Sequence, residues 1–315
     1  MRSTVLTTIA RGCVAASLSI AIGAGALTAA PASVPEVSAA SSLQAAADQQ
    51  QRRFAPHFGG TVFERPGESY REAFLRVRRT YGGKLGIVRL FYSGLPASWS
   101  KIRSNVGSTR LAISFRAAPA EVLAGRHDAA LRNWFADAPR GHVTRWSYMH
   151  EPENDSLNNG QYRRAWRHVN ELAQKAGNRK LRSTLILMCW TLEKNSGRDW
   201  RDYYPGARVI DVLAFDCYNA GHRNDTYRSV RELLSGAARL SKRIDKPWAI
   251  AELGSVVVGG DDGRGRAAWL KRVARFAHDR GARFVTYFDS DVGVDYRLHD
   301  AASRSAWRTI VRRSN

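Results

Sequence analysis

The fold of this 315-residue chain is decided by Arg145-Trp-Ser-Tyr-Met-His-Glu-Pro-Glu-Asn154 and Lys246-Pro-Trp-Ala-Ile-Ala-Glu-Leu-Gly-Ser255. Each stretch has a run of mostly apolar residues, then a carboxylate, then a turn signal. This pattern is typical of a buried parallel strand with an acid at its C-terminal end. In an eight-stranded α/β barrel, that end of the strands carries the reactive groups. We therefore expect Glu151 to close the fourth strand and Glu252 to close the seventh strand of one barrel.

Apolar, β-branched or aromatic runs recur along the rest of the chain and alternate with amphipathic helical patterns. The predicted strands are 57–63, 85–91, 110–115, 145–149, 183–190, 209–218, 248–253 and 283–288. The predicted helices are 69–81, 127–136, 160–176, 227–244 and 264–280. Alternation of this kind indicates a parallel sheet with helical crossovers, and eight strands favour closure. We predict the α/β class and a single (β/α)8 TIM barrel over residues 54–315, a length usual for that fold.

The N-terminal residues have the pattern of an export signal. Arg2 and Arg11 precede an apolar region from Cys13 to Ala30, and the small residues Ala30-Pro31-Ala32 follow. This order predicts a secretory signal peptide over residues 1–32 rather than a membrane anchor. Residues 33–53 are rich in Ala, Ser and Gln and are expected to form a disordered linker. The sequence therefore predicts a secreted, extracellular protein.

The chain is strongly basic, with a formal net charge of +21. Such a charge can serve nucleic acid, a membrane surface or an acidic polymer. Arginine supplies most of it, and the arginines are scattered over predicted helix faces rather than gathered in one stripe. We interpret the charge as mainly compositional and expect no nucleic-acid partner and a monomer. Electrostatic association with acidic wall polymers stays open.

Two cysteines remain after the predicted signal, Cys189 and Cys217. They fall in neighbouring predicted strands. In a secreted protein they could form one disulfide. Two buried free thiols are the alternative, and the sequence does not decide between them.

Glu151 and Glu252 have the residue type and the placement for hydrolysis of a glycosidic bond. A retaining glycosidase uses one carboxyl group to protonate the leaving oxygen and a second to attack the anomeric carbon. Their alternative role is as partners in structural ion pairs. Because both glutamates end strands on different walls of the barrel, each before its own turn signal, catalysis is the favoured interpretation.

Four further residues are candidates for contact with a substrate. Strand alternation places Asp216 and Tyr218 on one face and Cys217 on the other. Tyr218 can donate a hydrogen bond to a catalytic carboxylate, and Asp216 can bind a sugar hydroxyl. Trp190 offers an aromatic face for a sugar ring, and His150 can tune Glu151 or contact substrate. Each could instead be a core residue.

Other kinds of chemistry lack their motifs. The sequence contains no H-x-x-x-H, HExxH or CxxC, no G-x-S-x-G, and no glycine-rich phosphate-binding motif that opens a helix. We therefore expect neither a metal ion nor a cofactor.

These segments together resemble glycoside hydrolase family 26, whose best-known members are β-mannanases. The matching elements are Tyr148-Met-His-Glu151, Tyr203-Tyr-Pro-Gly206 with Asp211, Asp216-Cys-Tyr-Asn219 and the stretch 246–255. The resemblance implies Glu151 as acid/base, Glu252 as nucleophile, Asp216 in substrate binding and Tyr218 beside the nucleophile.

The resemblance also implies a retaining, endo-acting hydrolase of a β-linked polysaccharide, with β-mannan or β-glucan as the expected substrate. One feature departs from it. Typical mannanases of the family have tryptophans soon after the acid/base, whereas this chain has Pro152-Glu-Asn-Asp-Ser-Leu-Asn-Asn-Gly160. The alternative function is a non-catalytic carbohydrate- or cell-wall-binding protein on the same fold.

Overall fold

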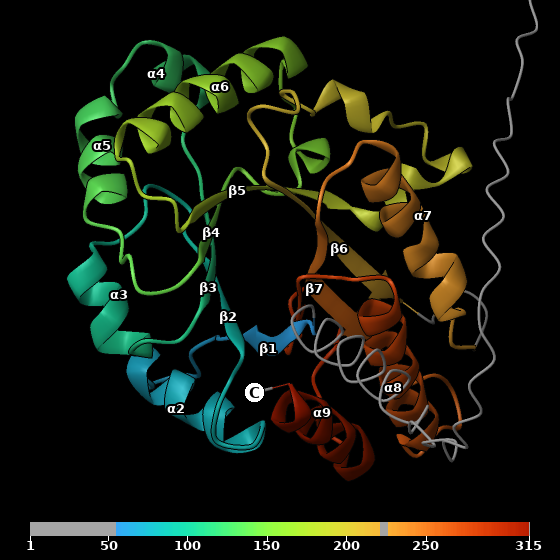
Figure 1. The fold of residues 1–315 in the computed structure, drawn as a ribbon. Coiled ribbons are helices and arrows are strands. Elements are labelled where there is room, and N and C mark those ends of the chain that lie inside the picture. Colours follow the sequence, from blue (N-terminus) through green and yellow to red (C-terminus); the bar gives the residue numbers. More distant parts are fainter. Residues whose placement is uncertain (1–54, 221–225, 315) are drawn as a thin grey trace, which may run out of the picture. The chain divides into compact units, whose positions relative to one another are not determined.

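The computed structural model describes residues 55–220 and 226–314. The predicted signal peptide (1–32) and linker (33–53) therefore lie outside the described residues. The described chain forms a closed barrel of eight parallel strands in sequence order (Figure 1). The strands are β1 (His57–Thr61), β2 (Ile87–Phe91), β3 (Leu111–Phe115), β4 (Thr144–Tyr148), β5 (Leu181–Met188), β6 (Val212–Asn219), β7 (Trp248–Ser255) and β8 (Phe284–Tyr287). Pairing of β1 with β8 closes the barrel, which confirms the predicted (β/α)8 fold.

Helices surround the ring of strands (Figure 1). They are α2 (Tyr70–Thr80), α3 (Trp99–Val106), α4 (Pro119–Leu123), α5 (Asp128–Ala136), α6 (Asn159–Lys175), α7 (Val230–Arg243), α8 (Arg264–Asp279) and α9 (Ala301–Arg313). The five predicted helices are present with small shifts of their ends. Helices α3, α4 and α9 were not predicted from the sequence. None of the helices in the described ranges is long and apolar enough to cross a membrane.

Local sequence explains where the helices begin and end. At the start of α2, the Ser69 side chain accepts from the backbone N–H of Glu72 while the Glu72 carboxylate accepts from Ser69, which is a capping box. Asp300 caps α9 by accepting from Ser303. After α8 the chain turns at Gly281, whose φ of 66° suits glycine. These caps fix the direction in which each crossover returns to the barrel.

The barrel separates two apolar regions. A large cluster that includes Trp146, Trp166, Trp269 and Trp307 fills the space between strands and helices. Inside the barrel a smaller cluster contains mostly short side chains, namely Ile87, Ala112, Ile186, Val212, Ala214, Ala249, Ala251 and Phe284. Such short side chains leave room above and below them for polar groups. Arg89, Asp216 and Glu252 lie toward one end of the barrel, and Arg145 lies toward the other.

Candidate active site

Glu151 lies in the loop after β4 rather than on the strand itself. The strand ends at Tyr148, and Met149 and Glu151 adopt left-handed backbone angles, with φ of 48° and 49°. Both are non-glycine residues, so this conformation costs about 1–3 kcal/mol each. The N–H of Glu151 donates to the carbonyl of Ile186 on β5 at 3.0 Å, which holds the loop to the barrel. The expectation that Glu151 closes the strand is thus wrong by three residues, because the strained turn intervenes.

Glu252 lies within β7, three residues before its end, and owes its direction to a bulge. Phe215 on β6 pairs with Ile250, but the next residue, Asp216, pairs with Glu252. Ala251 is the extra residue, and its side chain faces the barrel interior. Bulges re-aim side chains beside active sites. Here the bulge lets Glu252 face inward directly after Ala251.

The two glutamates meet Asp216 at the C-terminal mouth of the barrel. One carboxylate oxygen from each of Glu151, Asp216 and Glu252 lies within 4.8 Å of the others. Asp216 and Glu252 are buried and Glu151 is half-buried. The structure thus brings together three of the residues that the sequence analysis selected.

Each glutamate has its own hydrogen-bond partners. The Arg89 guanidinium donates to Oε1 of Glu252 at 3.3 Å, and the Tyr218 hydroxyl donates to Oε2. The hydrogen bond expected between Tyr218 and Glu252 is therefore present. Glu151 accepts from Nδ2 of Asn154 at 3.0 Å. The hydrogen bonds to Glu252 are stronger than the one to Glu151, because the Arg89 donor carries a full positive charge.

These surroundings set the protonation of the cluster. Burial, and then the charge of Glu252, raises the pKa of Glu151 to about 7. Burial also raises the pKa of Glu252, but the Arg89 charge and the Tyr218 hydrogen bond oppose that rise. Burial and the two glutamate charges raise the pKa of Asp216 well above its usual value. Glu151 and Asp216 therefore hold protons more tightly than ordinary carboxyl groups, while Arg89 and Tyr218 favour the ionised form of Glu252.

His150 and Trp190 occupy different positions around this cluster. His150 contacts the Phe91 ring at 5.5 Å, and its Nδ1 is buried without a hydrogen-bond partner among the described residues. Burial, and the nearby Arg89 and Arg116 charges, lower the pKa of His150 well below its usual value, so it is neutral. Trp190 is half-buried and lines a cavity of about 880 Å³ together with Asp216 and Tyr218.

A disulfide joins Cys189 to Cys217 beside that cavity. It connects the short 3-10 helix that carries Trp190 (Cys189–Leu192) to β6, where Asp216 and Tyr218 flank Cys217. The structure thereby decides between the two alternatives that the sequence left open.

Two residues of the site, Arg89 and Asn154, were not predicted from the sequence. An arginine inside Ile87-Val-Arg-Leu-Phe91 is a signal that could have been used, because a charge in an apolar strand requires a partner. Its guanidinium also lies 4.2 Å from the centre of the Phe91 ring. Asn154 carries no comparable signal, since asparagine is common in loops.

The carboxyl cluster also has the oxygen ligands that hard cations prefer. However, both oxygens of Glu252 already accept hydrogen bonds, one from a buried guanidinium. Arg89 thus supplies positive charge where a cation would otherwise do so. The donor set fits a carboxylate pair for acid–base and nucleophilic chemistry better than a metal centre.

Comparison with solved structures relates this barrel to known enzymes. The catalytic domain of a family 26 endo-β-1,4-mannanase from Bacillus sp. JAMB-750 matches with a TM-score of 0.57 at 14% identity, over 84% of this chain and 88% of that one. A family 26 β-mannanase from Bacteroides ovatus matches with a TM-score of 0.55 at 14% identity, over 84% of this chain and 91% of that one. The fold is that of the family 26 β-mannanases. The predicted resemblance to this family is thus supported by the fold.

Sequence comparison reaches less far. Endoglucanase H of Acetivibrio thermocellus is 27% identical over 160 residues, which are 49% of this chain. The chain spans 17% of the length of that relative. No family model matches the sequence.

Proposed function

We propose that this protein is a retaining, endo-acting glycoside hydrolase of a β-linked polysaccharide, with β-mannan or β-glucan as its substrate. The observation that carries the proposal is the approach of the Glu151 and Glu252 carboxylates to within 4.8 Å at the mouth of the barrel. Retaining enzymes hold these groups about 5–5.5 Å apart, whereas inverting enzymes need about 6.5–9.5 Å for a water molecule. Further support comes from similar proteins named β-mannanase and endoglucanase.

The surroundings of each glutamate suit one role. Glu151, with its pKa raised to about 7, carries the proton that the leaving oxygen needs. Glu252 attacks the anomeric carbon and forms a glycosyl–enzyme ester, while Arg89 and Tyr218 hold it ionised and oriented. Glu151 then removes a proton from water, which displaces Glu252 and restores the enzyme with retained configuration.

The walls of the site suit an uncharged sugar chain. Half-buried Phe63, Phe91 and Phe288 form an aromatic group, with Phe63 and Phe288 rings 5.3 Å apart. Trp190 lines the adjacent cavity. Asp216 lines this cavity as well, which places its carboxyl group to meet a sugar hydroxyl. In this proposal these aromatics replace the tryptophans that typical mannanases carry after the acid/base.

The proposal includes export, with residues 1–32 as the signal. Its test is the N-terminal residue of protein recovered from the medium of the native host. A chain that stays inside the cell and keeps its first 32 residues would contradict export without affecting the proposed chemistry.

Activity is tested first by a screen of the protein against mannans, β-glucans and xylans. Glu252→Ala should abolish turnover. Glu151→Ala should lose polysaccharide hydrolysis but keep far more activity on an aryl glycoside, whose leaving group needs no proton. Azide should then give a glycosyl azide of retained configuration with Glu151→Ala and of inverted configuration with Glu252→Ala. If the parent binds oligosaccharides but hydrolyses none of the polymers, the enzyme proposal fails and a carbohydrate-binding protein remains.

A further inference from the structure

The N-terminal end of the barrel contains a buried arginine that has no counter-charge among the described residues. Arg145, the second residue of β4, is 7% exposed, and its guanidinium lies 4.9 Å from the centre of the Phe284 ring. Its Nε and Nη1 atoms are buried and have no hydrogen-bond partner in the described part of the chain. A buried charge with unpaired donors is costly unless something outside the fold pairs with it.

The charged groups around Arg145 repel it. Arg182 on β5 is its direct register partner, and adjacent strands are about 4.8 Å apart. Arg110 directly precedes β3, and Arg283 directly precedes β8. Burial first, and then the charges of Arg283, Arg110 and Arg182, lowers the pKa of Arg145 to about 10. Like charges on adjacent strands destabilise a sheet, so an anion beside Arg145 and Arg182 would relieve this repulsion.

For Arg110, Arg145 and Arg182, no acid in the described ranges supplies that anion. The salt bridges of the described residues include none with Arg110, Arg145 or Arg182. Asp211, just before β6, accepts hydrogen bonds from the backbone and hydroxyl of Ser183 instead.

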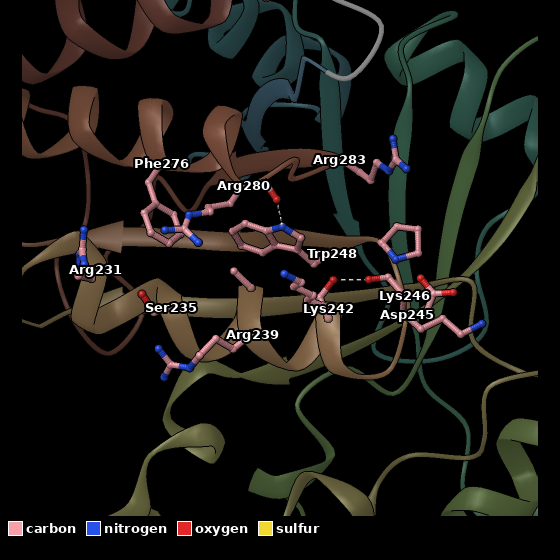
Figure 2. A pocket seen from close by; sticks show the side chains of 13 residues that line it. Arg231, Ser235, Arg239, Lys242, Asp245, Lys246, Trp248, Phe276, Arg280 and Arg283 are labelled. Atoms are coloured by element: carbon pink, nitrogen blue, oxygen red, sulfur yellow. Dashed lines mark hydrogen bonds between the residues drawn. The ribbon is translucent and has the colours of Figure 1, made fainter. Parts of the chain in front are cut away.

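A second group of cations continues from this cluster. Between α7 and α8 lies a groove of about 590 Å³, and we call it the basic groove. Figure 2 shows Arg280 and Arg239 on opposite sides of Trp248, the first residue of β7. Its basic residues are Arg231, Arg239, Lys242, Lys246, Arg280 and Arg283, and its one acid is Asp245. Arg283 lines the groove and also acts on the charge of Arg145, so the two groups of cations are neighbours at the N-terminal end of the barrel.

We propose that the N-terminal face of the barrel binds an acidic polysaccharide. Arg145 receives one carboxylate, and the basic groove holds the carboxylates that follow along the same chain. A guanidinium pairs with a carboxylate through two parallel hydrogen bonds, and a buried one does so with little competition from water. A polymer with several carboxylates suits the groove because six basic side chains line it.

Nucleic acid fits this face less well. Proteins that bind single strands stack bases on open aromatic faces. Here Trp248 is buried, and Arg280 covers Phe276 at 5.5 Å. The choice of a polysaccharide rests on the proposed function, whereas the anion site itself does not. The site lies at the opposite end of the strands from Glu151 and Glu252.

The first test is calorimetric titration of the full chain with a galacturonate hexamer at low salt. We expect the galacturonate hexamer to bind and its affinity to fall as NaCl is added. Any binding of mannohexaose should be the same in the parent and in Arg145→Met. Arg145→Met should lower the affinity for the hexamer by about tenfold or more, since the pair of Arg145 with a carboxylate is shielded from water. It should unfold at no lower temperature than the parent in anion-free buffer, because it removes an unpaired buried charge. A large loss of stability there would show a structural partner for Arg145 and overturn the proposal. Exposed Arg182→Gln should also weaken binding and provides a second variant.

The second test separates the basic groove from general charge. At low salt, the affinity for the hexamer should fall about tenfold or more in the groove triple, which combines Arg239→Gln, Lys242→Gln and Arg280→Gln. The control triple Arg71→Gln, Arg164→Gln, Arg304→Gln removes equal charge near the N-termini of α2, α6 and α9, at the other end of the barrel. Equal losses in both triples would overturn the proposal, as would tighter binding of single-stranded DNA or polyphosphate than of the hexamer.

The two proposals can fail separately. Hydrolysis of a neutral polysaccharide should be unchanged in the groove triple and in Arg182→Gln. If the parent hydrolyses no polysaccharide but Arg145→Met still abolishes hexamer binding, the proposed function fails and the acidic-polymer site stands. If hydrolysis is found and no acidic polymer binds, only the site is overturned.

Discussion

The guanidinium of Arg89 lies 3.3 Å from Oε1 of Glu252, and both side chains are buried, at 0% and 5% exposure. This ion pair is formed between β2 and β7, on different walls of the barrel. It lowers the pKa of Glu252 against the effect of burial, which raises it. The pair therefore favours the ionised form of Glu252.

Arg89→Met should cost both activity and stability. Without the guanidinium, Glu252 loses its compensating charge, and breaking a buried pair costs about 3–5 kcal/mol of folding stability. Turnover and urea unfolding measure the two effects. Arg89→Met combined with Glu252→Gln should recover most of the stability but no activity. If Arg89→Met alone is as stable and active as the parent, the ion pair has no such role.

Tyr218→Phe should lower turnover by about 10- to 100-fold, because a hydrogen bond to a charged group contributes about 1.5–3 kcal/mol. The fold should be intact, since the ring is retained and still stacks on Tyr296 at 4.9 Å. Tyr296→Phe is the matched control and should leave turnover nearly unchanged. Unaltered kinetics for Tyr218→Phe would demote Tyr218 to a core residue.

Gly254→Ala should disturb the same hydrogen bond indirectly. A Cβ at this position would lie 2.7 Å from Cδ1 of Tyr218 and 2.8 Å from Cγ of Tyr296. The Tyr218 ring would have to move away from Glu252, so we expect lower turnover with a smaller change in KM. Gly141→Ala, where the added Cβ meets nothing within 4 Å, is the control. Equal kinetics for the two variants would contradict this account.

The pH dependence follows from Glu151. Its folded-state pKa of about 7 is above the ordinary value of 4.5, so the folded state holds the proton more tightly. Folding stability should therefore fall as pH rises from about 4.5 to 7, by up to about 3 kcal/mol for this group. Turnover should decline above pH 7 as the proton is lost. Glu151→Gln should flatten the stability profile over this range, and an unchanged profile would argue against the raised pKa.

Removal of the disulfide should affect stability and substrate binding together. It closes a loop with a sequence separation of 28 residues, which corresponds to about 3–4 kcal/mol in the chain-entropy description. Because it also ties the segment of Trp190 to β6, the variant Cys189→Ser, Cys217→Ser should raise KM more than it lowers kcat. Thermal unfolding and steady-state kinetics are the measurements. A stable variant with unchanged KM would separate Trp190 from substrate binding.

Much of the fold could be predicted from the sequence, because the strands are buried on both faces and form long apolar runs. The predicted strand 248–253 lies entirely within β7. Helix α9 was missed although Asp300 provides a cap and Trp307 a buried anchor. Helices α3 and α4 are short, at 8 and 5 residues, so their periodicity is weak.

The site was predicted less completely, for two physical reasons. Strict strand alternation would place Ala251 inward and Glu252 outward, and only pairing with β6 reveals the bulge that turns Glu252 inward. The left-handed backbone angles at Met149 and Glu151 could not be predicted, because methionine and glutamate rarely adopt them. The ion pair of Arg89 with Glu252 could not be predicted either, because it forms only when closure of the barrel brings β2 and β7 together.

The bulge in β7 has a consequence for protein engineering. Up to Ile250, side chains of β7 alternate between the inside and the outside of the barrel as in a regular strand. From Glu252 onward, this alternation is shifted by one residue. Grafting the glutamate alone onto another eight-stranded scaffold would point its carboxylate under the helices. A transplant has either to carry the inserted alanine as well or to set the glutamate directly after the outward-facing residue that matches Ile250. Deletion of Ala251 would leave the glutamate facing inward, because it would then follow outward-facing Ile250 in regular alternation and still pair with Asp216.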